Sequence, residues 1–431
     1  MNTSVLTRQS EPLAAARSSF EGWRDGLRLL LLAGLPAVML LSSPNRVLLS
    51  IVISVGYIVA LLVIDRPATR ARPVMVYALV VAVFLTLQLL AAETINATSH
   101  DQQRYGFEKT AYFLTAVLPL ALVVAYLVRG VSDIKAIAWG FAAVGLALAV
   151  ATLLLRDPGL LGYGRYPWLG NLSAIGALVF VQSWLVRRPW LMALLTMLCV
   201  IGALLANSRQ SYVALIMGLI GTALFWLAVD LRQRRRQNRS LPRRQWLFPL
   251  ILGLAVPALT YGWTALPGQA TLPRLGLPDP RYCQCVVARL QNFSAQPGGR
   301  LDLLRGGVSL FRSHPLVGAG LGSFTNLHLG YQYPHNVALE LASETGLIGL
   351  LLLLGPIVAA MVRLVLRGVS RASGPIATLL AITLVWTAAA SFSGDLASER
   401  GFWIFGLLTV RLAWPGAARG GAPAQETEPI R

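Results

Sequence analysis

Residues 211–236 of this 431-residue chain read SYVALIMGLIGTALFWLAVDLRQRRR. The first nineteen residues of this stretch carry no charge, and four arginines stand among the last five residues. Nineteen helical residues reach about 28 Å, close to the ~30 Å thickness of a bilayer's hydrocarbon core. Because lipid offers no hydrogen bonds, such a segment has to be helical. The stretch predicts a transmembrane helix whose basic end faces the cytoplasm.

The same pattern recurs along the whole chain. Hydrophobic residues make up 55% of the sequence and charged residues 13%, whereas soluble proteins have about 25% charged residues. The first apolar run lacks a convincing cleavage site, so we expect no cleavable signal. We predict an all-α polytopic membrane protein of about twelve spans, at 27–42, 46–64, 74–92, 110–128, 136–155, 170–186, 190–206, 211–229, 246–264, 347–362, 376–392 and 401–414.

Basic residues set the predicted orientation. With the N-terminus inside, 24 of the 37 Lys and Arg residues fall in inner segments and 13 in outer ones, and six of those 13 lie in one long loop. We read the basic run 232–244 as an anchor at anionic lipid, and the net charge of +19 does not indicate nucleic acid. The expected organisation is a cytoplasmic segment 1–26, spans 27–264, a long outer loop 265–346, spans 347–414 and a disordered cytoplasmic tail 415–431.

Cysteine and histidine usage argues against a metal centre. Cys199 lies within a span, where it fills apolar space. Cys283 and Cys285 form a C-x-C pair in the outer loop, too close for an unstrained bridge, and their oxidation state stays open. The chain has no metal-binding motif and no nucleotide-binding Walker motif, so we expect no metal and no cofactor.

The long outer loop contains two expected short helices. Residues 301–315, LDLLRGGVSLFRSHP, place apolar residues at helical spacing and predict an amphipathic helix that Pro315 ends. A glycine-rich turn follows at 316–324. A second helix is expected to start at Asn336, as its cap, and to break near Gly346.

His335 lies at the start of that second helix, where the macrodipole disfavours imidazolium. A neutral histidine can act as a general base, although position alone favours a capping or interfacial role. Arg209 ends a span at the outer face. Its guanidinium suits either phosphate in bidentate geometry or snorkelling to headgroups. Arg300 follows Gly298 and Gly299 and leaves the same choice between a phosphate ligand and a solvated charge.

Four further residues are possible supporting groups. Arg305 and Arg312 lie on the amphipathic helix and fit surface charges better than a site. Glu344, four residues after Glu340, fits a structural role or one that orients the histidine or an arginine. Asn336 adjoins the candidate base.

The pattern as a whole resembles a known family. His335-Asn336, nine residues, Gly346, two residues and Gly349 give H-N-x9-G-x-x-G. With NSRQSYVALIMGLIG at 207–221 and GGRLDLLRGGVSLFRSHPLVGAGLGSF at 298–324, this spacing resembles the O-antigen ligase and polymerase superfamily, and within it the ligases. The similarity is concentrated in 205–222 and 298–350. One position departs from the ligase pattern, since Val213 stands where a leucine is usual.

The resemblance implies a C-type glycosyltransferase-like fold in the bacterial inner membrane, with both termini in the cytoplasm and the active site at the periplasmic face. The outer loop 265–346 would then be a periplasmic catalytic loop. It implies transfer of O-antigen polysaccharide from undecaprenyl diphosphate to the lipid A–core oligosaccharide, without a metal and with inversion. His335 then corresponds to the essential histidine, and Arg209 and Arg300 to arginines of the diphosphate site. Membrane lipids are the remaining expected partners.

Three other functions stay open. An O-antigen polymerase uses the same donor, and a protein O-oligosaccharyltransferase passes the glycan to Ser or Thr of a secreted protein. A transporter of lipid-linked glycan belongs to a different class. It should carry ionisable residues near the midplane of its spans, whereas here the charges gather at the outer face.

Overall fold

The regular structure of this chain is helical throughout the part that the computed structural model describes. That part comprises residues 10–41, 47–64, 72–94, 100–155, 166–182, 188–206, 208–237, 244–265, 300–326, 332–371, 373–392 and 394–414. The first helices are α2 Ser10–Leu41, α3 Val47–Ile64, α4 Arg72–Thr94, α5 His100–Tyr112, the π-helical η3 Phe113–Val117, α6 Leu118–Leu127, α7 Val131–Leu155, α8 Tyr166–Val181 and α9 Pro189–Leu205. The others are α10 Arg209–Gln237, α11 Arg244–Ala265, α13 Arg300–Ser313, the 3-10 helix η7 Ser323–Asn326, α14 Val337–Arg371, α15 Gly374–Phe392 and α16 Arg400–Ala413.

Each of the twelve predicted spans overlaps a described helix. Six described stretches are long and apolar enough to cross a membrane: Val74–Ala91, Gln102–Leu127, Val131–Leu154, Gln210–Arg236, Val337–Ser370 and Gly374–Phe392. The all-helical, multi-pass class is therefore confirmed, and the number twelve stays a prediction. The predicted tail 415–431, most of the loop before Arg300, and Cys283 and Cys285 lie outside the described residues.

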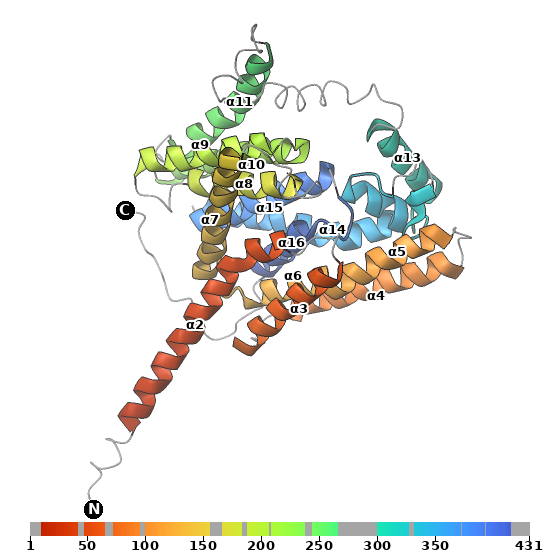
Figure 1. Ribbon diagram of the computed structural model, residues 1–431, viewed down its shortest axis with the longest axis horizontal. Coiled ribbons are helices and arrows are strands. Elements are labelled where there is room, and N and C mark those ends of the chain that lie inside the picture. The colour runs from red at the N-terminus through yellow and green to blue at the C-terminus, as the bar shows by residue number, and fades with distance from the viewer. Residues whose placement is uncertain are drawn as a thin grey trace, which may run out of the picture.

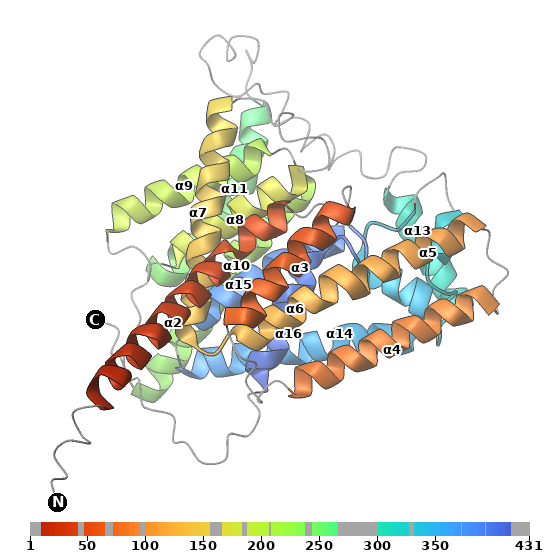
Figure 2. The same ribbon diagram turned by 60° about the horizontal axis from the view of Figure 1, so that its bottom comes forward.

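The helices form two groups around four central helices, α6, α14, α15 and α16. On one side, α8 packs against α7, α9 and α10, and α10 also contacts α11 and α15. On the other, α4 and α5 run side by side, with α13 near their end of the molecule, as Figures 1 and 2 both show. Between them α16 packs against α6, α14 and α15. These four helices connect the core to the candidate site.

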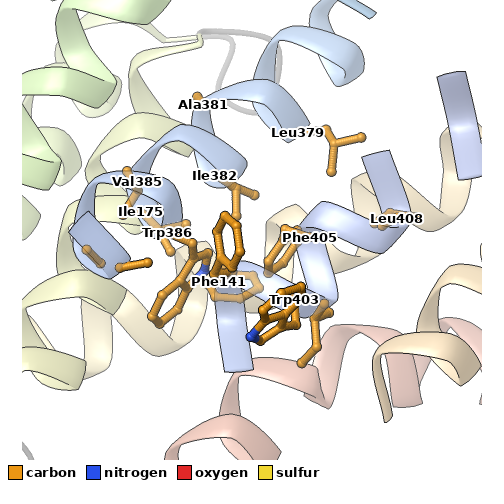
Figure 3. Packing of buried hydrophobic residues seen from close by; sticks show 14 of the residues in the cluster. Phe141, Ile175, Leu379, Ala381, Ile382, Val385, Trp386, Trp403, Phe405 and Leu408 are labelled. Carbon is orange, nitrogen blue, oxygen red and sulfur yellow. The ribbon is translucent and has the colours of Figure 1, made fainter. Parts of the chain in front are cut away.

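Aromatic side chains fill the centre of the bundle. Figure 3 shows Trp386, Phe405, Trp403 and Phe141 converging there from α15, α16 and α7. The rings of Phe141 and Phe405 meet edge to face with centroids 5.4 Å apart, a favoured arrangement of aromatic pairs. All four side chains are at most 1% exposed. The centre is thus a packed core, and Cys199 lies buried in the surrounding apolar cluster as expected.

The described part of the long loop contains the two helices that the sequence predicts. The amphipathic helix is α13, which ends at Ser313, two residues before Pro315. The second helix, α14, is interrupted at Gly346, whose φ of 68° and ψ of −170° are not helical. A Cβ atom at Gly346 would lie 2.3 Å from the carbonyl oxygen of Leu316. The break therefore exists because the glycine-rich turn after Pro315 passes through the space that a side chain would occupy.

Polar contacts join segments that the sequence predicts to lie on the same side of the membrane. At the predicted inner side, Arg28 binds Asp133 at 3.1 Å and Asp25 at 3.4 Å. At the predicted outer side, contacts join the segments 93–109, 207–210, 265–346 and 393–400, as described below. The contacts are those expected if each group of segments lies at one face, and the identity of each face stays a prediction.

Candidate functional site

His335 lies in the turn that precedes α14, in a conformation that few residues adopt. Its φ is 57°, and it is the one non-glycine residue with positive φ in the described part of the chain. Such left-handed conformations cost about 1–3 kcal/mol and concentrate at functional sites. The imidazole is half-buried and meets the Tyr333 ring edge to face, with centroids 4.6 Å apart. The turn therefore holds the histidine in a defined orientation at the helix start.

Asn336 caps α14, which confirms the prediction. Its Oδ1 accepts a hydrogen bond from the Leu339 N–H at 2.9 Å, the pattern of an N-cap. Its Nδ2 donates to the Ser391 carbonyl at 3.0 Å, near the end of α15. The cap thus ties the start of the His335 helix to the segment that leads into α16.

The start of α13 lies at the same end of the molecule as the start of α14. Gly307 of α13 packs against Leu339, and eight residues later the Pro315 carbonyl accepts a hydrogen bond from the Leu347 N–H at 2.8 Å. From the first contact to the second, each segment advances by eight residues toward its C-terminus. The two segments therefore run in the same direction. Arg300, the first residue of α13, is therefore at the His335 end of the pair.

Arg209 is the first residue of α10, and its neighbour Gln210 places this helix start in the same region. Gln210 Nε2 donates a hydrogen bond to Glu399 Oε1 at 3.3 Å, just before α16 begins. The side chains of Arg209 and Arg300 lie outside the described part of the chain. The structure therefore places each arginine at the start of a helix.

A buried ionic network supports this end of the molecule, and the sequence did not predict it. Lys109 Nζ lies 2.7 Å from Glu340 Oε1 and 2.6 Å from Glu344 Oε2, and all three side chains are at most 2% exposed. The spacing of the two glutamates did indicate a shared helix face. Of the roles left open for Glu344, the structure supports the structural one, because this carboxylate binds Lys109 of α5.

The turn at 394–399 extends the network toward α10. Glu340 Oε2 accepts a hydrogen bond from the Leu396 N–H at 2.8 Å. Asp395 Oδ2 accepts one from the Tyr105 hydroxyl at 2.8 Å, one helical turn before Lys109. Through Glu399 the same turn reaches Gln210, so α5, α14, α16 and the start of α10 are held together.

Glu399 and Arg400 are charged residues in a deeply buried setting. Burial raises the pKa of the Glu399 carboxyl to about 8, the hydrogen bond from Gln210 lowers it, and nearby Asp395 raises it further. The neutral acid therefore predominates at pH 7. The Arg400 guanidinium is fully buried and lies 5.7 Å from the ring centroids of both Tyr112 and Trp168. A cation between two aromatic faces is a stabilising arrangement.

The remaining predicted residues lie on surfaces or in packing positions. Arg305 is largely exposed and lies 3.5 Å from Asp302 of the same helix. Arg312 is exposed at the end of α13. The structure brings neither of them to the network. Val213 is half-buried against the core, as expected for a packing residue.

Comparison with known proteins points to the same part of the chain. The family model described as O-antigen ligase matches residues 192–354. This stretch runs from α9 into α14 and includes Arg209, Arg300 and His335. Lys109 and the turn at 394–399 lie outside it. No curated protein matches the chain.

Proposed function

We propose that this protein is an O-antigen ligase, and the match of the O-antigen ligase family model to residues 192–354 supports this. It transfers O-antigen polysaccharide from undecaprenyl diphosphate to the lipid A–core oligosaccharide at the periplasmic face of the inner membrane. One observation carries the proposal. The starts of α10, α13 and α14, which hold Arg209, Arg300 and His335, lie at one end of the molecule beside a shared buried network.

The donor diphosphate binds between Arg209 and Arg300. A guanidinium matches phosphate oxygens in bidentate geometry and keeps its charge at any physiological pH. Both arginines are first residues of helices, where backbone N–H groups and the macrodipole also favour an anion. As the glycosidic bond breaks, its electron pair passes to the diphosphate oxygen. Two arginines stabilise the negative charge that develops on this leaving group.

His335 acts as the general base. The positive end of α14 favours the neutral imidazole, which accepts the proton of the acceptor hydroxyl as its oxygen attacks the anomeric carbon. The new glycosidic bond forms on the face opposite the departing diphosphate, so a single displacement inverts the anomeric centre. General-base assistance is typically worth about 10²–10⁴-fold in rate.

The decisive experiment replaces His335 in cells. In a strain that lacks the chromosomal gene, the His335→Ala variant should reach the membrane at the normal level but leave every lipopolysaccharide band without polymer. Lipid-linked polymer should accumulate. Wild-type complementation is the control, and normal transfer by the variant would remove the base assignment.

The phenotype of the deletion strain, from its lipopolysaccharide, its glycoproteins and the location of its polymer, separates the other candidate functions. A single repeat still attached to core indicates a polymerase. Unchanged lipopolysaccharide with an altered glycoprotein indicates protein glycosylation. Polymer retained on the cytoplasmic side of the membrane indicates a transporter.

A further inference from the structure

The turn between α13 and α14 presents two large apolar side chains outward. Leu316 is 63% exposed and Val317 is 56% exposed, and they follow one another at the tip of the turn. Pro315 precedes this pair. Gly318, with a φ of 75°, follows it. Exposing two apolar side chains to water costs free energy. Their position at the tip of the turn therefore raises the question of what surrounds them.

The backbone of this tip is fixed by the protein itself. The Pro315 carbonyl accepts a hydrogen bond from the Leu347 N–H at 2.8 Å, and the Leu316 carbonyl accepts one from the Ile348 N–H at 3.1 Å. The next carbonyl, of Val317, accepts from Gln88 Nε2 of α4 at 3.2 Å. Three successive carbonyls thus have protein partners. Irregular backbone at membrane depth is tolerated only when the protein satisfies its polar groups in this way.

Two separate helices give the depth of the tip. Gln88 lies inside the apolar stretch Val74–Ala91, about one turn from its end. Leu347 and Ile348 follow directly after the Gly346 break and open the apolar part of α14. The tip is therefore level with the edge of the hydrocarbon core as judged from either helix.

The apolar surface of the tip continues onto its neighbours. The adjoining apolar side chains that are exposed are Leu87 (59%) and Leu90 (52%) of α4, and Leu347 (41%), Ile348 (49%) and Leu351 (59%) of α14. On the other side of the tip, the polar residues Arg312 and His314 are exposed. We propose that this tip is a membrane anchor, with Leu316 and Val317 inserted among the acyl chains of the leaflet at this end of the bundle.

Acyl chains fit this apolar surface better than a protein partner does, because the surface is continuous with the exposed apolar faces of α4 and α14. The exposed positions carry no charge and no aromatic residue that would act as a binding anchor. The anchor is independent of the proposed reaction. It would hold the loop between α13 and α14 at the bilayer whichever glycan is transferred.

Fluorescence quenching tests the proposal directly. In a background of Cys199→Ala, Cys283→Ser and Cys285→Ser, the Leu316→Cys variant is labelled with an environment-sensitive fluorophore and reconstituted into phosphatidylcholine vesicles. Lipids with a spin label near the top of the acyl chain should quench the emission. Aqueous iodide should quench it roughly tenfold less than at a water-exposed site, because ions are excluded from hydrocarbon.

The matched control is Ser309→Cys, an exposed position on α13 about two turns earlier. There the order should reverse, with strong quenching by iodide and little by the lipid spin label. Iodide quenching at Leu316→Cys equal to that of the control would place the tip in water and overturn the proposal. Protection of that label from both quenchers would also overturn it, because a second copy or another protein would then cover the tip.

Discussion

Arg209 and Arg300 are the residues whose chemistry the proposal specifies most closely. Bidentate recognition requires a planar guanidinium, which lysine does not supply although it keeps the charge. We expect Arg209→Lys and Arg300→Lys each to lower transfer by about 10²-fold, the scale reported for losing an electrostatic partner of a developing anion. In proteoliposomes, donor use should suffer more than acceptor binding. Full activity in either lysine variant would show that bidentate recognition is wrong at that site.

The raised pKa of Glu399 predicts that the free energy of unfolding depends on pH. Its pKa is raised to about 8 by burial, so the folded state keeps the proton that an unfolded chain releases near pH 4.5. The stabilisation is complete below about pH 4.5 and is lost as the pH rises toward 8. At about 1.4 kcal/mol per unit of pKa, the dependence amounts to at most about 5 kcal/mol.

The Glu399→Gln variant isolates this contribution. The amide keeps the carbonyl that accepts from Gln210 but carries no titratable proton. Its melting temperature in detergent, relative to wild type, should rise between pH 5 and pH 8.5. A difference that stays constant over this range would show that Glu399 does not titrate there.

Helices α5 and α14 are joined by Lys109, and this contact predicts a specific pattern of stability. Lys109→Met leaves Glu340 and Glu344 buried without their cation, which should destabilise the protein by about 3–5 kcal/mol. A triple variant that adds Glu340→Gln and Glu344→Gln removes the uncompensated charge. It keeps an acceptor for the Leu396 N–H and should recover most of the lost stability.

Transfer activity should follow stability in this series, because the three side chains are at most 2% exposed and so do not touch substrate. Thermal unfolding in detergent and transfer in vesicles measure the two effects separately. A Lys109→Met variant as stable as wild type would contradict the ionic role assigned to the contact.

At the scale of the whole molecule, the proposal depends on which side of the membrane each group of segments faces. In the cysteine-free background described above, Ser309→Cys should react with a membrane-impermeant maleimide added to cells whose outer membrane is permeabilised. Gln233→Cys, in the basic end of α10, should react only after lysis. Reaction of Ser309→Cys only after lysis would place α13 in the cytosol and end the donor-site proposal.

The sequence by itself determined the helical, multi-pass class, the short helix before Pro315, the cap at Asn336 and the break at Gly346. The spans, the helix end and the cap depend on local physics, whereas the break at Gly346 also makes room for the turn after Pro315. Apolar length sets the spans, proline and glycine set the ends, and a cap bonds within its own first turn.

Only the tertiary structure decided that Lys109 is the partner of Glu340 and Glu344, and that Glu399 meets Gln210. These partners are separated by more than 180 residues in the chain. Spacing places a side chain on a helix face, but which helix covers that face depends on the packing of the entire bundle. For this reason the sequence yielded candidate site residues, and the fold supplied the network beside them.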